Sequence, residues 1–256
     1  TISTVIMVHG LEIITNKQMS KTNLKFWLQW FLLIQSCKSA KQVIVPSEYT
    51  KNKLLENNIL PDEKKIRVLP EGVSQDYLKT YSQDQINEVK SFFGINKEYL
   101  LFNSTLQPRK NVEGLLKAFV KVHQSHPDLC LVLAGKKGWE YESIFETIKR
   151  LNLSEHVKYL DWVGQDKLPM LYAGAKGFVN FSFEEGFSLT LAQAMATGIP
   201  CAVSDIPTHR VLGKDFVFYA NPNSTEDMTE TISKLLNQTS EENLINAKRS
   251  AEQYTW

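Results

Sequence analysis

The chain has 256 residues, enough for one large domain or for two of ordinary size, about 100 to 200 residues each. Its 29 Lys and Arg residues nearly balance its 28 Asp and Glu residues, which argues against a basic nucleic-acid-binding surface and against a strongly acidic partner. With 43% hydrophobic residues, the composition is that of a globular protein that can bury a core.

Apolar runs alternate along the chain with segments of helical periodicity, which is typical of βα units built around a parallel sheet. We therefore expect an α/β fold. Most of these runs are apolar on both faces, as strands covered by helices must be. The candidate strands are residues 4–8, 42–46, 67–69, 99–104, 129–134, 157–160, 177–181, 200–204 and 216–219.

The clearest helix covers residues 111–123. Its apolar side chains, including Val112, Leu116 and Phe119, share one stripe, and Asn111 stands where an N-cap residue is expected. We expect this helix to pack on the sheet.

A polar segment, YLKTYSQDQINEVKSFFGINK, interrupts the alternation of strands and helices before it restarts at Tyr99. We therefore predict a partial N-terminal domain over residues 1–76, a linker over 77–96 and a C-terminal domain over 97–256. The second domain has enough strands for a doubly wound, Rossmann-like sheet, whereas the first has few. The chain also starts without a methionine and stops directly after a helical pattern, so we expect an internal piece of a longer protein.

The three cysteines, Cys37, Cys130 and Cys201, are widely spaced and odd in number. The last two lie inside apolar, strand-like runs. This pattern does not suggest a disulfide framework or a zinc site; it indicates reduced core thiols in a cytoplasmic protein.

Cations follow two neighbouring strands of the predicted sheet. STLQPRKN, with Arg109 and Lys110, comes after the run 99–104, and GKKGW, with Lys136 and Lys137, comes after the run 129–134. Ligands of open parallel sheets bind beyond the carboxyl ends of the strands, and helix N-termini there favour anions. The two loops therefore predict a phosphate or pyrophosphate site, the alternative being that these side chains are merely solvated.

A third loop carries two carboxylates, Glu184 and Glu185, followed by Gly186, directly before a helix that starts near Ser188. Either carboxylate could simply cap that helix. Together with the facing basic loops, however, they favour recognition of a polyol beside a phosphate.

Several other classes lack their motifs. No G-x-G-x-x-G follows a strand, GKKG does not have the spacing of a P-loop, and there is no G-x-S-x-G elbow. No Asp-x-Asp pair is present, which argues against a transferase that holds its nucleotide through a divalent metal. We predict no metal and no cofactor.

These residues occur in an order and spacing that resemble family 4 glycosyltransferases of the GT-B fold, which transfer a sugar from a nucleoside diphosphate with retention of configuration. The resemblance covers nearly the whole chain, from VIMVHG and AKQVIVPSEYTKNKL through STLQPRKNVEGLLKAF to EEGFSLTLAQAMATGIP, its most specific block. The RKN-type subgroup that it resembles includes many mannosyltransferases. The resemblance implies a GDP- or UDP-linked hexose donor and a glycan or polyprenyl-linked acceptor in surface polysaccharide assembly.

The resemblance also assigns roles, with His9, Glu185 and Lys110 as the catalytic residues. His9 would face the reacting sugar from the first domain, and Glu185 is the first glutamate of the E-x7-E motif near the transferred sugar. Lys110 and Arg109 would hold the pyrophosphate. The other residues placed at the donor are Lys136, Trp162, Val163, Gly186, Phe187, Ser188, Leu189 and Gln193.

The chain departs from the family pattern at several of these positions. Gln193 replaces the second glutamate, Gly10 replaces the aspartate after the histidine, Ser188 replaces a glycine and Arg210 replaces a glutamate. A glutamine has only one carbonyl acceptor for the ribose hydroxyls. Gln193, Gly10 and Arg210 leave open a noncatalytic nucleotide-sugar-binding subunit that supports another transferase. A weaker alternative is a GT-B epimerase or phosphorylase.

The longest apolar run, LKFWLQWFLLI at residues 24–34, is too short to cross a bilayer as a helix. We expect a helix that packs on the N-terminal sheet and is partly uncovered by truncation. The alternative is a helix that rests on a membrane and approaches a lipid-linked acceptor.

Overall fold

The computed structural model of the chain describes residues 4–11 and 24–255. The chain forms two compact units. The first consists of residues up to 71 together with 185–187, and the second consists of residues 72–184 together with the chain from 188 onward.

The first unit contains a parallel sheet in the order β1-β2-β3. Its core is formed by apolar side chains of the sheet and of the helices, such as Val43, Val45 and Leu54. Strand β1 is covered least, since Val5 and Met7 are exposed. The elements are β1 (Val5–Met7), α2 (Leu24–Ser39), β2 (Gln42–Val45), α3 (Glu48–Glu56), the 3-10 turn η1 (Glu63–Lys65) and β3 (Ile66–Val68).

Helix α2 has two apolar faces. Trp30, Leu33 and Ile34 pack against the core of the first unit, as expected for a helix that covers the N-terminal sheet. The opposite face exposes more than half of each side chain of Trp27, Leu28, Phe31 and Leu32. Within the described part of the chain, no helix has the length and hydrophobicity needed to span a bilayer.

The second unit contains an all-parallel sheet in the order β6-β5-β4-β7-β8-β9. The chain adds β5 and β6 on one side of β4 and then returns to place β7 on the other side. The strands are β4 (Glu98–Asn103), β5 (Leu129–Ala134), β6 (Val157–Asp161), β7 (Gly177–Asn180), β8 (Cys201–Ser204) and β9 (Phe218–Ala220). The candidate strands of both units are confirmed, with ends that differ by at most two residues.

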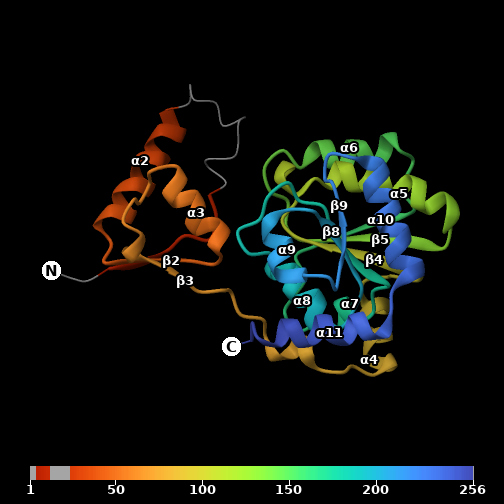
Figure 1. Cartoon of the computed structure of the whole chain (residues 1–256). Helices are drawn as coiled ribbons and strands as arrows, with labels where there is room; N and C mark the ends of the chain where they lie inside the picture. The colour runs from red at the N-terminus through yellow and green to blue at the C-terminus, as the bar shows by residue number, and fades with distance from the viewer. Residues whose placement is uncertain (1–3, 12–23, 256) are drawn as a thin grey trace. The chain divides into compact units, whose positions relative to one another are not determined.

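Helices cover both faces of this sheet (Figure 1). One group packs together as α6, α5 and α10, and the other as α4, α7, α8, α9 and α11. Their bounds are η2 (Gln75–Leu78), α4 (Gln83–Phe92), η3 (Pro108–Lys110), α5 (Val112–Ser125), α6 (Glu142–Arg150), α7 (Leu168–Ala173), α8 (Leu189–Thr197), α9 (Pro207–Gly213), α10 (Thr225–Gln238) and α11 (Glu241–Glu252).

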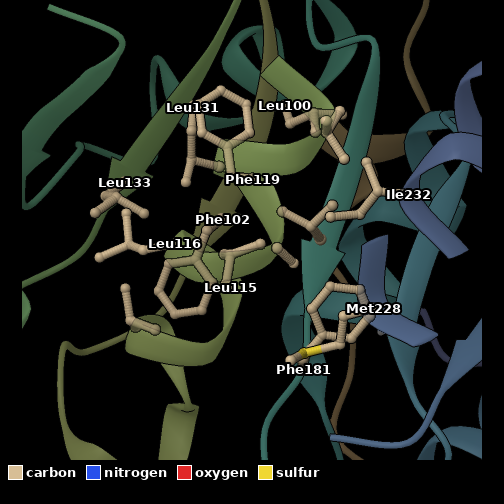
Figure 2. Packing of buried hydrophobic residues seen from close by; sticks show 14 of the residues in the cluster. Leu100, Phe102, Leu115, Leu116, Phe119, Leu131, Leu133, Phe181, Met228 and Ile232 are labelled. Atoms are coloured by element: carbon tan, nitrogen blue, oxygen red, sulfur yellow. The ribbon is translucent and has the colours of Figure 1, made fainter. Parts of the chain in front are cut away.

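Strand β4 shows why the sheet needs helices on both faces. Leu100 and Phe102 point into the core shared with α5 and α10, where Phe119 and Ile232 pack (Figure 2). The alternate residue Tyr99 is also fully buried, and its hydroxyl donates to the carbonyl of Leu171 on α7 at 2.7 Å. Because successive side chains of a strand point to opposite faces, both layers are anchored on this strand.

The polar segment 77–96 contains helix α4, which belongs to the second unit. A capping box between Ser82 and Gln85 starts the helix, because each residue's side chain accepts a backbone N–H of the other. Helix α4 packs on α7, and Tyr77, just before it, is almost completely buried. The cysteines Cys37, Cys130 and Cys201 are buried and free, as their spacing predicts.

Candidate functional site

The switch point of the second unit lies between β4 and β7, and the loops that leave these strands are joined by hydrogen bonds. The N–H of Phe183 donates to the carbonyl of Arg109 at 2.9 Å, and the Arg109 guanidinium donates to the carbonyl of Glu184. The loop after β5 joins the same cluster because the N–H of Leu106 donates to the carbonyl of Lys136 at 2.9 Å. The convergence of loops predicted from the sequence is therefore present.

The cations on these loops have different surroundings. Lys110 ends η3 and is only 8% exposed, whereas Lys136 is exposed, with its Nζ 6.0 Å from the ring centre of Trp162. Lys137 lies 5.1 Å from the ring centres of both Tyr141 and Phe145, so its charge is used in cation–π contacts. Lys110 is thus the buried cation of this loop cluster.

Helix α8 starts at the same edge of the sheet, directly after the loop that follows β7. Ala192, Ala194 and Ala196 are fully buried, so the helix packs closely, as the small residues predict. Its N-cap residue, Ser188, has the left-handed conformation, with φ 74° and ψ 56°. Leu189 is the first helical residue, and its backbone N–H belongs to the positive end of the helix dipole.

Residues 185–187 cluster with the first unit, although the chain connects them directly to α8. Glu185 and Phe187 are buried, and Gly186 is half-buried. Strand β6 forms one edge of the sheet of the second unit, and Trp162 and Val163 follow it directly. Trp162 is exposed and Val163 is buried.

Gln193 is held by a buried tyrosine that the sequence reasoning missed. The Tyr172 hydroxyl lies 3.4 Å from Gln193 Oε1 and 3.3 Å from the carbonyl oxygen of Thr190, and it accepts a hydrogen bond from Asn103 Nδ2 at 2.9 Å. Burial raises the pKa of Tyr172 well above its ordinary value, so this hydroxyl stays a neutral donor. The signal in the sequence that could have pointed to this tyrosine is the position of Asn103, which ends the central strand β4 at the switch point.

His9 lies after β1 in the first unit, and its Nδ1 is 2.8 Å from a carboxylate oxygen of Glu71. Glu71 follows β3, so the pair comes from the carboxyl ends of two strands of the same sheet. The sequence reasoning noted that Gly10 stands in place of an aspartate but missed Glu71, which supplies a carboxylate to His9. With Nδ1 oriented by Glu71, the other ring nitrogen is the one available to a substrate.

Arg210 pairs with the loop before its own helix and stacks on a residue of strand β9. Its Nε and Nη2 donate to the two carboxylate oxygens of Asp205 at 2.6 and 2.7 Å, and its guanidinium stacks 3.9 Å from the ring centre of Tyr219. The hydrogen bonds from Arg210 lower the pKa of Asp205. Arg210, where the family pattern has a glutamate, is therefore part of a structural pair.

A cavity of about 370 Å³ opens beside the N-terminus of α5. It shares Gln107, Pro108 and Phe183 with the switch-point loops, but its lining includes none of the predicted donor ligands. Among the described residues, no group of three or more His, Cys, Asp or Glu side chains is arranged to hold a metal ion.

The second unit is an α/β protein with an open parallel sheet, and a buried lysine and a helix N-terminus lie at its switch point, the place where sheets of this class bind ligands. Residues 84–251 match the family described as glycosyl transferases group 1, and the chain belongs to that family. The glycosyltransferase family predicted from the sequence is confirmed.

Two curated bacterial relatives are mannosyltransferases of O-antigen chains. The chain is 27% identical to O-antigen chain mannosyltransferase B of Escherichia coli over 88% of its own length and 59% of the relative's. It is 26% identical to O-antigen chain mannosyltransferase RfbU of Salmonella typhimurium, over 80% of its length and 54% of the relative's. The chain therefore spans little more than half of each relative.

Solved structures of low sequence identity share the fold. Alr3699/HepE of Anabaena, in complex with UDP and glucose, superposes with a TM-score of 0.82 at 21% identity and covers 99% of this chain and 67% of that one. Sucrose-phosphate synthase from Thermosynechococcus elongatus gives a TM-score of 0.81 at 18% identity, covering 98% and 64%. The predicted α/β fold of GT-B type is confirmed.

Proposed function

We propose that the chain is part of a retaining, metal-independent glycosyltransferase that moves mannose or a similar hexose from a GDP- or UDP-linked donor to a glycan or polyprenyl-linked acceptor. The observation that carries this proposal is the buried Lys110 on a loop hydrogen-bonded to the loop that leads into α8. The mannosyltransferases among the relatives and the UDP and glucose bound by Alr3699/HepE support the donor class.

In this reaction the bond between the anomeric carbon and the β-phosphate oxygen breaks, and negative charge grows on the departing nucleoside diphosphate. Lys110, Lys136 and the N-terminus of α8 stabilise that charge, which is the role that a metal ion has in other transferases. The acceptor oxygen forms the new bond to the anomeric carbon on the face that the leaving group vacates, and the acceptor hydroxyl gives its proton to the departing β-phosphate oxygen.

The donor is identified by thermal shift of the chain with UDP, GDP, ADP and their mannose or glucose conjugates. We expect one nucleotide to raise the melting temperature clearly above the others, because a ligand that binds only the folded state stabilises it. A chain whose melting temperature responds to none of these ligands would contradict the donor assignment.

A noncatalytic nucleotide-sugar-binding subunit is the second candidate, and Gln193 favours it because the second carboxylate of the motif is absent. A turnover assay separates the two candidates once the responding donor is known. Transfer to an acceptor, or slow hydrolysis of the donor, supports the enzyme. Donor binding without either reaction in the intact protein supports the subunit.

For the acceptor side we propose peripheral contact with the inner face of the cytoplasmic membrane through the exposed face of α2. Phe31 and its apolar neighbours lie on the helix that ends near the exposed Lys38 and Lys41, a combination suited to anionic lipid. The buried free thiols are in keeping with this cytoplasmic location.

Flotation with vesicles containing phosphatidylglycerol tests this contact. The wild-type chain is expected to float with the vesicles, and Leu28→Asp with Phe31→Asp is expected to remain at the bottom. Ile245→Asp, which changes an exposed apolar residue on α11, is the matched control and should float like the wild type. Equal flotation of all three proteins would contradict the α2 contact.

A further inference from the structure

The serine that starts α8 differs from the other serine N-caps of the described α-helices. Its side chain makes no capping hydrogen bond to the helix, and its backbone is left-handed. In the other cases the serine is extended and its hydroxyl accepts the N–H of the third helical residue. These serines are Ser47 of α3, Ser82 of α4, Ser224 of α10 and Ser240 of α11.

The hydroxyl of Ser188 is bound by His209 instead. Ser188 Oγ lies 3.0 Å from His209 Nε2, and both side chains are buried, His209 completely. His209 Nδ1 is 3.0 Å from the carbonyl oxygen of Ser204 and 3.1 Å from its hydroxyl, which itself donates to the carbonyl of Ser182 at 2.6 Å.

These partners assign the hydrogen atoms. A carbonyl can only accept, so Nδ1 carries the proton and donates to Ser204. In the neutral imidazole Nε2 is then an acceptor, and Ser188 donates its hydroxyl hydrogen to it. Ser188 is thereby tied to α9 through His209, which belongs to that helix.

The hydrogen bond between Ser188 and His209 affects the first turn of α8. The left-handed conformation is unfavourable for serine, and an N-cap serine ordinarily adopts the extended conformation and caps its own helix. Here the bond to His209 offsets that preference, and the N–H groups of Leu189 and Thr190 have no acceptor within the described part of the chain. Such N–H groups bind anions.

We propose that His209 is a positioning residue that holds Ser188 in the left-handed conformation and so keeps the first-turn N–H groups of α8 open for the donor diphosphate. This inference rests on the proposed function, because it assumes that the diphosphate binds at α8. Without His209, Ser188 returns to the extended conformation, and its hydroxyl caps α8 by accepting the N–H of the second or third helical residue. The first turn then has fewer N–H groups left to donate to phosphate.

A double-mutant cycle tests the proposal, with the affinity for UDP and for GDP measured by calorimetry. His209→Leu fills the space of the ring without its hydrogen bonds and is expected to weaken binding about tenfold. Ser188→Gly supplies the second background, since glycine adopts the left-handed conformation readily and has no hydroxyl to cap with. In the glycine background, His209→Leu should then have no further effect.

The outcomes separate the two proposals. Equal losses from His209→Leu in the serine and glycine backgrounds would show that His209 only supports packing, and wild-type affinity in the single variant would also overturn the inference. A wild-type chain that binds neither nucleotide would instead contradict the proposed function, and the inference would fall with it.

Two further variants keep the cycle decisive. His209→Gln retains an acceptor near the position of Nε2 and is expected to restore most of the affinity. If His209→Leu does not fold, His209→Asn replaces it, because asparagine can still bond Ser204 but is too short to reach Ser188. The same dependence on Ser188 is expected, and its absence would overturn the assignment.

Discussion

Replacing Lys110 by methionine is expected to weaken binding of the responding nucleoside diphosphate by about 30- to 1000-fold, or roughly 2–4 kcal/mol. The side chain is only 8% exposed, so its ammonium acts where water screens charge little. Methionine keeps the apolar stem and removes the charge, which limits damage to packing. Calorimetry measures the affinity, and the rate of sugar transfer in the intact protein should fall by about 100-fold or more.

Lys137→Met is the matched control for this variant. Lys137 is on the neighbouring loop of the same cluster, but its ammonium lies over the rings of Tyr141 and Phe145. We expect its affinity for the nucleotide to stay within about twofold of the wild type. A Lys110→Met protein that binds donor and transfers sugar like the wild type would disprove the pyrophosphate assignment.

Gly135→Ala is expected to lower the free energy of unfolding of the second unit by at least about 3 kcal/mol. Gly135 has φ 131°, a conformation that alanine rarely adopts, and a Cβ there would overlap the backbone carbonyl of Ser104. The backbone of Ser104 cannot move cheaply because its N–H donates to the carbonyl of Ala134. Urea unfolding followed by circular dichroism measures the loss.

Gly198→Ala isolates the conformational part of this cost. Gly198 also has a positive φ, of 76°, but a Cβ there would approach nothing closer than Lys248 Cδ at 3.9 Å. We expect a loss of about 1–2 kcal/mol. Equal losses in the two variants would show that the contact with Ser104 adds nothing and that the loops after β4 and β5 can separate easily.

The strands and their order along the chain could be predicted because local patterns determine them. Runs such as residues 129–134 are apolar on both faces, and the structure buries all of Leu129–Ala134. The pairing of β4 with both β5 and β7, which creates the switch point, follows from the usual behaviour of parallel sheets. Helix α4 was harder to predict because its polar composition resembles that of a linker, although its serine and glutamine form a capping box.

The candidate site could be predicted only as far as its residues are adjacent to strand ends. Asn111 was correctly placed as the N-cap of α5, but its side chain makes no cap and donates to the carbonyls of Phe181 and Pro222. Tyr172 and His209 are brought to the site by α7 and α9, and no local pattern marks them. Long-range contacts of this kind depend on the packing of whole helices, which sequence periodicity does not encode.

The hydroxyl of Tyr172 has one hydrogen atom and two carbonyl-type acceptors, the oxygens of Gln193 and Thr190, at nearly equal distances. Rotation of the hydroxyl about its C–O bond therefore exchanges one acceptor for the other without moving any heavy atom. When a ligand hydroxyl donates to Gln193, the tyrosine can turn its hydrogen to Thr190 and remain satisfied. The fully packed layer between α7 and α8 can thus accommodate two hydrogen-bonding arrangements while its side chains stay in place.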